Sequence, residues 1–433
     1  MSVSDAVLLG APIFKGPVLD VTWRGRCLEL DRMIDRLGLI SSQDALLLLR
    51  ASFGVPRVQY MMRCSPSVDH PALDEFDKSL RTAVSRITNA DLTDLQWKQA
   101  SLPIRMGGLG VRRVASLALP AFLASAASTL PIQSSILAST NAMEDDYISA
   151  FVAKWQAVTG RVIESSALPV KQALWDQPCV QLDKEEVENA LTDMEQKARL
   201  LAVSAPHSGD WLVALPLTSC GLRLDDEAVR VAVSLRLGVS LGAPHTCRCG
   251  AAVDARGLHS FVCKKAPGRI VRHQQLNDMV TRTLISAGVP ATKEPIGLLR
   301  TDGKRPDGMT LIPWQDGKLL VWDVTVTTTL ADSYVASAAR RAGEVAEQAA
   351  IRKQAKYSAL SNAYSFLPLA FETLGPMNEE AFLFFGCLSR RLSGISGDNR
   401  ESSFLFQRLS IAIQRFNSVL FRDSFLSSVE PDQ

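Results

Sequence analysis

The chain has 433 residues, which is enough for two to four domains of ordinary size. Hydrophobic residues make up 47% and charged residues 21%. This composition excludes disorder over the whole chain, because disordered chains combine low hydrophobicity with high net charge. Lysine and arginine (47) nearly balance aspartate and glutamate (45), so the net charge of +2 excludes a histone-like polycation but not a local basic patch.

The first part of the chain is predicted to be helical. In residues 1–130 apolar side chains recur at helical spacing. The most apolar stretch, residues 117–139, is interrupted by Pro120 and Pro131, so we interpret it as a buried helix and expect no membrane partner. Residues 131–244 are predicted to form a helical connector.

The eight cysteines are too few for a disulfide framework in a chain of this length. The first residues lack the basic start and the long apolar run of a signal peptide. We therefore expect an intracellular protein, either nuclear or cytoplasmic. Three of the cysteines are crowded between residues 247 and 263, where they indicate a metal site.

A cysteine- and histidine-rich segment covers residues 245–268. Its four candidate zinc ligands are Cys247, Cys249, His259 and Cys263. Zinc prefers four sulfur or nitrogen ligands in a tetrahedron, and the gap of three residues between the last two ligands suits one helical turn. The segment therefore predicts a zinc knuckle, in which His245 is an alternative ligand. The other interpretation is a group of unligated thiols beside an unrelated histidine.

A basic segment overlaps this knuckle. Residues 247–307 contain 11 Lys or Arg and 5 Asp or Glu, which gives a net charge of +6 in a chain whose total is +2. Charge concentrated in this way favours a polyanionic partner over an evenly solvated surface, which is the alternative interpretation.

The remaining residues, 269–433, alternate between helix and strand patterns. The predicted helices are Ile270–Ala287 and Ser333–Ser358, and the predicted strands are Thr310–Ile312, Lys318–Val326 and Phe366–Phe371. This order is typical of an α/β arrangement with a mixed sheet. The chain as a whole is therefore predicted to be α+β, with an all-α N-terminal region followed by the knuckle and an α/β core.

Two aspartates near the first two strands are candidate metal ligands. If Gln315-Asp316-Gly317 is a three-residue hairpin loop, Met309 lies opposite Asp323, and alternation places Asp307 and Asp323 on one face. Two converging carboxylates suffice for Mg²⁺ or Mn²⁺, which keep several waters when bound. A two-residue loop would shift the register by one and separate the carboxylates.

Other roles for these acids are open. An aspartate in an apolar strand is costly to bury unpaired, so a structural salt bridge from Asp323 to Arg305 or Arg340 is the alternative to metal binding. Glu294 is a candidate third acid near the same strand end. As an isolated residue it would be an ordinary surface glutamate.

Two lysines on the following helix could serve the same site. Lys353 and Lys356 are three residues apart on one helical face. A lysine near a metal-bound water can orient that water and offset the charge that develops on a phosphate. Lysines on helices are usually just solvated, so this assignment depends on a family resemblance.

Several motifs of the second half occur in a recognisable order. They are Arg272-His273, Asn277-Asp278, Arg305-Pro306-Asp307-Gly308, Trp322-Asp323-Val324-Thr325-Val326 and Phe371-Glu372-Thr373-Leu374-Gly375-Pro376. With the knuckle, they resemble the zinc knuckle and restriction-like endonuclease that end the polyproteins of early-branching non-LTR retrotransposons, a nuclease of the PD-(D/E)XK class. Residues 1–130 resemble the thumb region that follows the palm of the same reverse transcriptases, through Leu8–Pro12 and Gln99–Gly110.

The resemblance implies roles for individual residues. Asp307 and Asp323 would be metal ligands, with Glu294 as a third catalytic acid. The class expects a lysine two residues after the second acid, where this chain has Thr325, so the resemblance favours Lys356 from the next helix, with Lys353 second. The expected nucleic-acid-binding residues are Arg269, Arg272, His273, Lys304 and Arg305.

The YxDD motif of the polymerase is missing, so the resemblance implies a truncated element or a domesticated remnant without reverse transcriptase activity of its own. The expected partners are a DNA target, element RNA and a full-length reverse transcriptase acting in trans. The leading hypothesis is a Mg²⁺- or Mn²⁺-dependent DNA endonuclease with a structural zinc. The alternatives are a non-catalytic nucleic-acid-binding remnant and, less favoured, an interaction scaffold built on the N-terminal helices.

Overall fold

Two compact units make up the chain in a computed structural model. The described residues are 5–136, 146–163, 168–298, 303, 305–360 and 362–425. The N-terminal unit comprises residues 1–103 and 108–190, and the C-terminal unit comprises residues 104–107 and 191–433. Of the boundaries expected from the sequence, the one at residue 130 falls inside the first unit, and those at residues 244 and 268 fall inside the second.

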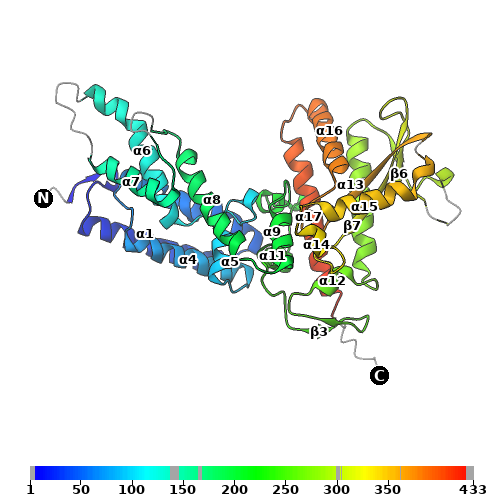
Figure 1. The fold of residues 1–433 in the computed structure, drawn as a ribbon, viewed down its shortest axis with the longest axis horizontal. Coiled ribbons are helices and arrows are strands. Elements are labelled where there is room, and N and C mark those ends of the chain that lie inside the picture. Colours follow the sequence, from blue (N-terminus) through cyan, green and yellow to red (C-terminus); the bar gives the residue numbers. More distant parts are fainter. Residues whose placement is uncertain are drawn as a thin grey trace. The chain divides into compact units, whose positions relative to one another are not determined.

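The N-terminal unit is helical apart from a short hairpin formed by β1 (Val7–Leu8) and β2 (Ala11–Pro12). Its helices are α1 (Pro17–Leu37), α2 (Ser42–Leu48), α3 (Val55–Cys64), α4 (Pro71–Thr88), α5 (Asp94–Ser101), α6 (Val114–Ile136), α7 (Asp146–Thr159) and α8 (Gln172–Ala190). Helices α1 and α4 lie side by side (Figure 1), with Trp23 and Phe76 buried in edge-to-face contact between them. The region expected to be all-α is therefore helical except for this hairpin, because apolar faces of several helices pack on one another.

Helix α6 is the most apolar of these helices. In the described part of the chain it is the one helix that could cross a membrane by length and composition, over Val114–Gln133. The core helix of a soluble protein satisfies the same criteria. In this unit α6 packs against α3, α4 and α8, and Pro120 and Pro131 lie inside it without ending it. Its first two backbone amides, of Val114 and Ala115, donate to the carboxylate of Asp77 at 2.7 and 3.1 Å.

The C-terminal unit contains both helices and strands. Its helices are α9 (Met194–Val203), α10 (Asp210–Val213), α11 (Asp226–Leu237), α12 (Leu258–Val262), α13 (Gly268–Ser286), α14 (Val335–Ala338), α15 (Glu344–Lys356), α16 (Glu379–Ser396) and α17 (Glu401–Arg422). Its strands are β3 (His245–Thr246), β4 (Ala252–Val253), β5 (Ala291–Lys293), β6 (Gly308–Thr310), β7 (Leu319–Thr327) and β8 (Tyr364–Glu372). The chain is therefore mixed α+β, as expected.

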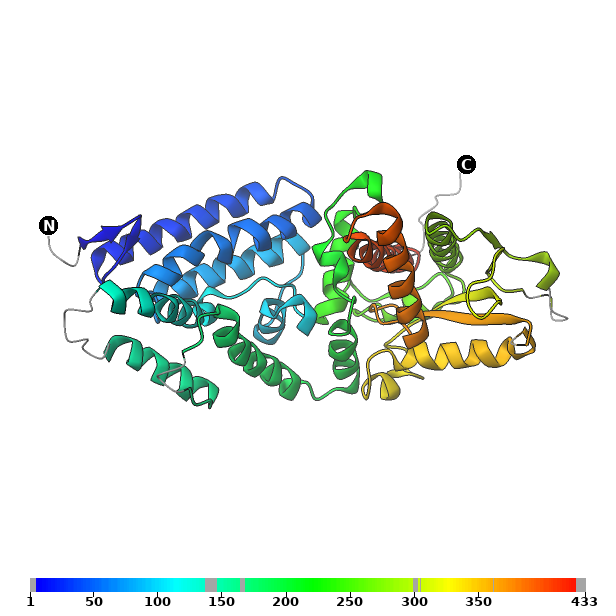
Figure 2. The ribbon, with the colours of Figure 1, turned by 90° about the horizontal axis from the view of Figure 1, so that it is seen from above.

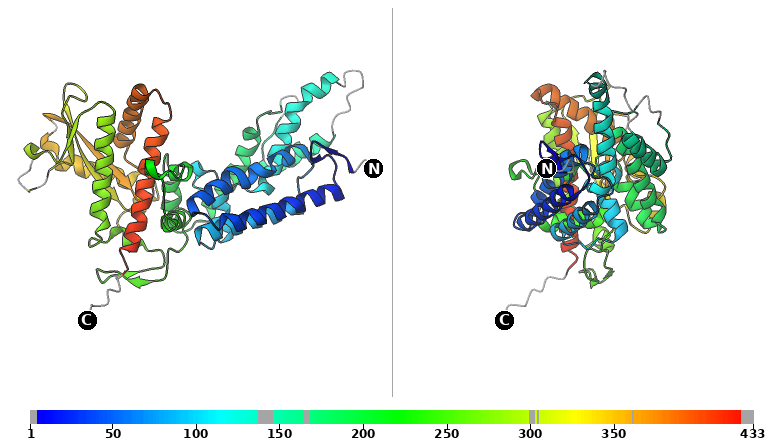
Figure 3. Two further views of the ribbon diagram at one scale, coloured as in Figure 1. Left: turned by 180° about the vertical axis from the view of Figure 1, so that it is seen from behind. Right: turned by 90° about the vertical axis from the view of Figure 1, so that its left-hand side faces the viewer.

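The main sheet has the strand order β5-β6-β7-β8. Its first three strands are antiparallel, and β7 and β8 are parallel, joined through α14 and α15, so the expected mixed sheet is present. Alternate residues of β7, namely Leu320, Trp322 and Val324, pack into a core with α13, α16 and α17. Figure 3 shows α13 and α17 next to each other, and Figure 2 shows α15 running beside β8 on the sheet.

The hairpin between β6 and β7 differs from the sequence prediction. Gln315 pairs with Lys318, so the loop has two residues, Asp316 and Gly317, whose φ angles of 49° and 73° suit a tight hairpin turn. The expected three-residue loop is wrong. Residues 311–314 leave the ladder, and the Thr310 hydroxyl accepts the Leu320 amide at 2.9 Å. The pairing of β6 with β7 is therefore displaced by two residues from the predicted one.

The register that results pairs Gly308 with Trp322 and Met309 with Val321. Asp307 precedes this ladder, and its amide donates to the Trp322 carbonyl at 3.0 Å. Met309 therefore faces Val321 and not Asp323, contrary to the prediction. Asp307 is nevertheless close enough to Asp323 for its charge to raise the pKa of Asp323. The helix expected over residues 333–358 is broken into α14 and α15 before Gly343, whose φ of 80° starts the second helix.

Candidate metal centre and active site

The predicted knuckle brings its four candidate ligands together. All four ligand atoms, from Cys247, Cys249, His259 and Cys263, lie within 4.8 Å of one another. The sulfurs of Cys247 and Cys263 are 3.6 Å apart, and the sulfur of Cys249 is 3.1 Å from Nε2 of His259. Within the described residues this is the one cluster of three or more such side chains close enough to hold a metal ion.

Two local structures position these ligands. The β3–β4 hairpin turns tightly at Gly250, whose φ is 93°, and the Cys247 amide donates to the Ala251 carbonyl at 2.8 Å. This turn places Cys247 and Cys249 on the same side. Helix α12 carries His259 and ends at Cys263, whose amide donates to the His259 carbonyl at 2.9 Å. The three-residue gap therefore spans one helical turn, as predicted.

The environment of the cluster suits a cation that binds thiolates. Burial raises the pKa of Cys247 to about 11, so this thiol ionises only with a positive partner. The pKa of Cys249 is lowered to about 6, first by the Ala251 amide and then by His259 and the other two thiols. A tetrahedron with Zn–S bonds of about 2.3 Å has sulfurs roughly 3.8 Å apart, close to the observed spacing. The cluster could therefore hold a metal ion such as zinc.

His245, the alternative ligand, is engaged elsewhere. Its Nε2 lies 2.8 Å from the hydroxyl of Ser424, and its ring stacks on Phe425 at 3.9 Å. The Arg248 amide also donates to the Ser424 carbonyl at 3.2 Å. The knuckle is thus attached to the end of α17 and belongs to the same packed unit as the sheet.

Close packing fixes Asp307 relative to β7. The backbone of Gly308 lies against the Trp322 ring, and a Cβ at residue 308 would be 2.0 Å from that ring. The indole nitrogen of Trp322 donates to Asn277 Oδ1 at 2.8 Å, and Asn277 Nδ2 donates to the Asp307 carbonyl at 2.9 Å. The Asp-Gly sequence and the tryptophan therefore lock the acidic strand onto α13.

The Asp307 carboxylate has two further partners. Its Oδ2 accepts the Val324 amide at 2.6 Å and lies 2.9 Å from Nε2 of His273. The hydrogen bond to Asp307 raises the pKa of His273, against the opposing effect of burial. His273, expected to contact nucleic acid, lies against one of the two acids, and its role toward nucleic acid stays a prediction.

Asp323 is buried, with 3% of its surface exposed. It faces α15, because the neighbouring positions of β7 face the opposite core. Burial raises the pKa of the Asp323 carboxyl, the nearby charge of Asp307 raises it further, and Lys353 opposes both. Nζ of Lys353 forms an ion pair with Oδ1 of Asp323. Among the described residues, Asp323 therefore pairs with Lys353 and not with Arg305 or Arg340, the two partners considered from the sequence.

The two lysines of α15 have different positions. Lys353 contacts Asp323, whereas Nζ of Lys356 lies 2.9 Å from the Tyr357 hydroxyl and 4.4 Å from the centre of its ring. Lys353 is thus the lysine that is seen to pair with Asp323, and which of the two lysines acts in catalysis stays a prediction. The Tyr357 hydroxyl also donates to the Arg305 carbonyl at 3.1 Å, and Tyr357 is among the groups that lower the pKa of Asp323.

The third expected acid does not join the pair. Glu294 follows β5 in a left-handed conformation with a φ of 48°, and its exposed carboxylate forms an ion pair with Arg305. Its amide donates to the Asp307 carbonyl at 3.0 Å, so the two backbones are adjacent. Arg305 is thus paired with Glu294. Lys304, another expected nucleic-acid contact, lies outside the described residues.

A basic hollow of about 600 Å³ lies beside the acid pair. It is lined by Lys264, Lys265, Ala266, Pro267, Arg269, Ile270, Arg272, His273, Val324, Thr325, Val326 and Lys353. Arg269 and Arg272, both expected to bind nucleic acid, are therefore together in one place. Arg272 is not at the surface, however, since only 3% of it is exposed.

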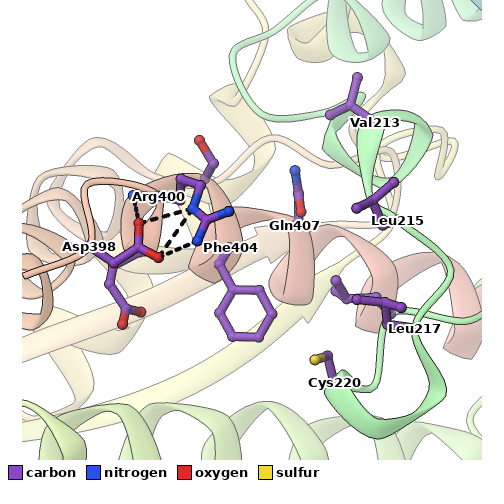
Figure 4. Close-up of a pocket in the computed structure, with 11 residues that line it drawn as sticks. Val213, Leu215, Leu217, Cys220, Asp398, Arg400, Phe404 and Gln407 are labelled. Atoms are coloured by element: carbon purple, nitrogen blue, oxygen red, sulfur yellow. Dashed lines mark hydrogen bonds and ion pairs between the residues drawn. The ribbon is translucent and has the colours of Figure 1, made fainter. Parts of the chain in front are cut away.

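A second hollow, of about 470 Å³, is lined by other residues of the same unit. Figure 4 shows Leu215 and Leu217 on one side of it and the ion pair of Asp398 with Arg400, at 2.8 Å, near the other end. None of its lining residues belongs to the knuckle or to the acid pair. Its lining is mostly apolar, and it contributes no group to the chemistry described above.

Sequence reasoning missed three contributors to the site. Asn277 and Trp322 appeared only as parts of motifs, and Tyr357 had no assigned role, yet all three hold Asp307 or Asp323. The signal for Trp322 was available, since a glycine beside the first acid leaves space for a large ring across the ladder. Comparison of the chain with protein-family models and with curated proteins finds no match.

Proposed function

We propose that the chain is a metal-dependent DNA endonuclease of the restriction-like type, derived from the C-terminal part of a non-LTR retrotransposon polyprotein. The observation that carries the proposal is the arrangement of Asp307, Asp323 and Lys353 at the junction of β6, β7 and α15. Two acids at a mixed sheet and one lysine beside them are the groups that the family resemblance requires. The lysine comes from the helix, as the resemblance implies, but at residue 353.

The two acids suit a hard cation that keeps its own waters. The charge of Asp307 raises the pKa of the nearby Asp323, so a cation bound by both carboxylates would relieve an unfavourable pairing. Only two carboxylates converge, because Glu294 pairs with Arg305. Mg²⁺ is commonly bound through one or two carboxylates, with waters and substrate phosphates as its other ligands.

A Mg²⁺ or Mn²⁺ ion held there would supply an activated water for attack on the phosphodiester. The chain's own residues would do the rest. Lys353 is the nearest cation to Asp323 and is placed to offset the charge that develops on the phosphate. His273 and the Val324 amide hold Asp307 Oδ2 in one orientation, so that its other oxygen can face the metal.

The zinc knuckle has a structural role in this proposal. Its four candidate ligands would fill the four positions of a structural zinc site, in which no position is left for substrate or water. The cluster lies immediately before Lys264 and Lys265 in the chain and is attached to α17. Zinc would therefore fix the basic segment that leads into α13.

The test is nicking of supercoiled plasmid in the presence of Mg²⁺. Wild-type protein should nick the plasmid, and Asp323→Asn and Asp307→Asn should each reduce the rate by roughly 10³-fold, because each removes a metal ligand. Asp316→Asn, at the exposed hairpin tip, is the matched control and should nick at the wild-type rate. Wild-type nicking that survives in Asp323→Asn would overturn the proposal.

One observation favours a second candidate, a nucleic-acid-binding remnant without activity. Lys353 already neutralises Asp323, and the basic hollow could bind a strand without any cleavage. This candidate predicts that wild-type protein retards plasmid in a gel in a salt-sensitive way, with no nicking at any Mg²⁺ or Mn²⁺ concentration. The same plasmid assay therefore separates the two candidates.

A further inference from the structure

Arg272 is buried without the partners that a buried cation normally has. It lies one turn into α13, is 3% exposed, and has no hydrogen-bond partner at Nε or at Nη1 among the described residues. Burial, with a smaller effect from Arg269, lowers the pKa of Arg272 to about 10, so the side chain stays charged at neutral pH. An unpaired buried charge costs several kcal/mol, so this arginine calls for an anion.

The surroundings of Arg272 are basic. The hollow that it lines also contains Lys264, Lys265 and Arg269, and none of the residues that line it is acidic. Arg269 Nη1 reaches only the Cys263 carbonyl, at 3.5 Å. Asp423 caps the start of α13, where its Oδ2 accepts the Gly268 amide at 3.0 Å, and it is not part of the lining. An anion in this hollow would therefore meet several cations and no competing carboxylate.

The hollow also adjoins the acid pair. His273 and Lys353 line it, and these two side chains contact Asp307 and Asp323, respectively. An anion bound by Arg272 would thus lie next to the proposed scissile position without occupying it. This placement suits the repeating charges of a nucleic acid strand, in which one phosphate follows another at a fixed spacing.

We infer that this hollow is a binding site for a single phosphate group of a nucleic acid strand, with Arg272 as its buried anchor and Lys264, Lys265 and Arg269 around it. The inference rests on the proposed function in one respect, that the phosphate belongs to the strand acted on at Asp307 and Asp323. Arginine suits this role because its planar guanidinium presents several fixed N–H donors to phosphate oxygens. The phosphate is either an internal diester or a terminal monoester.

The test measures binding in the absence of Mg²⁺ and Mn²⁺, so that cleavage does not interfere. The probes are inorganic phosphate and two short single-stranded DNAs of one sequence, one with a 5′-hydroxyl and one with a 5′-phosphate. Wild-type protein should bind all three saturably and be stabilised by them against heat. Equal affinity for the two DNAs indicates an internal diester, and at least 10-fold preference for the 5′-phosphate indicates a terminal monoester.

The decisive variant is Arg272→Met, which should weaken binding of inorganic phosphate and of DNA at least 10-fold. It should also raise the melting temperature of the free protein, since it removes an unpaired buried charge. Arg282→Met, on an exposed position of the same helix, is the matched control and should change neither quantity. If Arg272→Met does not fold, the double variant of the exposed Lys264 and Lys265 to Met provides the same comparison and should weaken binding at least 3-fold.

The outcomes separate this inference from the proposed function. Asp323→Asn should bind the probes like wild-type protein, so lost nicking with intact binding bears on the nuclease alone. The phosphate site is overturned if wild-type protein shows no saturable binding of inorganic phosphate or of DNA. It is equally overturned if Arg272→Met, or the lysine double variant where Arg272→Met does not fold, binds both as tightly as wild-type protein. Either result would leave the nicking assay to decide the nuclease by itself.

Discussion

Each unit buries an aspartate, and the two aspartates are treated in opposite ways. Asp77, in the N-terminal unit, accepts two amides at the start of α6, and the nearby Arg112 and Arg113 form separate two-bond pairs with Asp176 and Asp183. Asp323, in the C-terminal unit, faces a second acid, and a lysine from another element neutralises it.

The difference lies in what completes each site. The partners of Asp77 are backbone groups that are present whenever α6 forms, so this acid is part of the fold. In the C-terminal unit, Asp323 is neutralised by a side chain that could exchange partners. Three features of this unit, the thiol cluster, the acid pair and Arg272, suit external ions. In this chain, a buried charge therefore indicates function only where backbone groups do not already neutralise it.

The largest expected effect is from removal of metal, which should act on one unit only. Cys249→Ser with Cys263→Ser should lose about one equivalent of zinc and several kcal/mol of stability around the knuckle. Elemental analysis and hydrogen exchange measure the two results, and exchange in α1 and α4 should be unchanged. Cys387→Ser, an exposed cysteine of the same unit, is the control. Wild-type protein purified without chelator but free of zinc would contradict the knuckle.

The next effect tests the packing of Gly308 on Trp322, which fixes Asp307 relative to β7. Gly308→Ala should cost about 3 kcal/mol in the free energy of unfolding, because its Cβ would lie 2.0 Å from the Trp322 ring. Chemical denaturation measures this cost. Gly297→Ala is the matched control, since nothing lies within 4 Å of a Cβ at that position. Equal stability of the two variants would show that Trp322 does not hold β6 in place.

A smaller effect distinguishes the two lysines of α15. Lys353→Met should reduce Mg²⁺-dependent nicking about 10²-fold, which corresponds to roughly 2.7 kcal/mol of transition-state stabilisation. Lys356→Met, one turn away, should reduce it less than about 3-fold. The rates are compared on the same supercoiled plasmid. If Lys356→Met has the larger effect, the ion pair of Lys353 with Asp323 is structural. Asp323 would then be neutralised as part of the fold, as Asp77 is.

The smallest effect is a pH dependence in the N-terminal unit. Burial raises the pKa of Asp77 to about 6, despite its two amide donors. The folded state then binds the proton more tightly than the unfolded state, so the free energy of unfolding should fall, on the order of 2 kcal/mol, as the pH rises from about 4 to 6. Asp77→Asn should flatten this decline. An unfolding free energy that instead rises over this range in wild-type protein alone would show that the amides dominate.

Much of the C-terminal fold could be predicted from local pattern. Helix α13, strands β7 and β8 and the one-turn spacing of His259 and Cys263 follow from periodicity and ligand spacing, which depend on neighbours in the chain. The proximity of Asp307 and Asp323 was also predicted, but from a three-residue loop and a pairing of Met309 with Asp323 that the structure does not have. The two-residue turn and the break after Thr310 together shift the pairing of β6 with β7 by two residues, and no local signal announces the break.

The position of Lys353 beside Asp323 has a signal in the sequence. At 100° per residue, Lys353 falls at the centre of the buried stripe that includes Ala346 and Ala350, whereas Lys356 falls at its edge. Reading that stripe would have favoured Lys353. The roles of Asn277 and Tyr357 depend on contacts between distant elements, and neither position is distinguished by its own neighbours in the sequence.

The break after Thr310 has a practical consequence for engineering the chain. Because the Thr310 hydroxyl anchors Leu320, the spacing of the two acids is set on the sheet side of the break and not at the exposed turn of Asp316 and Gly317. A peptide tag or a fluorophore could therefore be inserted at that turn without moving Asp307 past Asp323. The hairpin tip is thus a place from which a label could report on the acid pair while leaving its geometry alone.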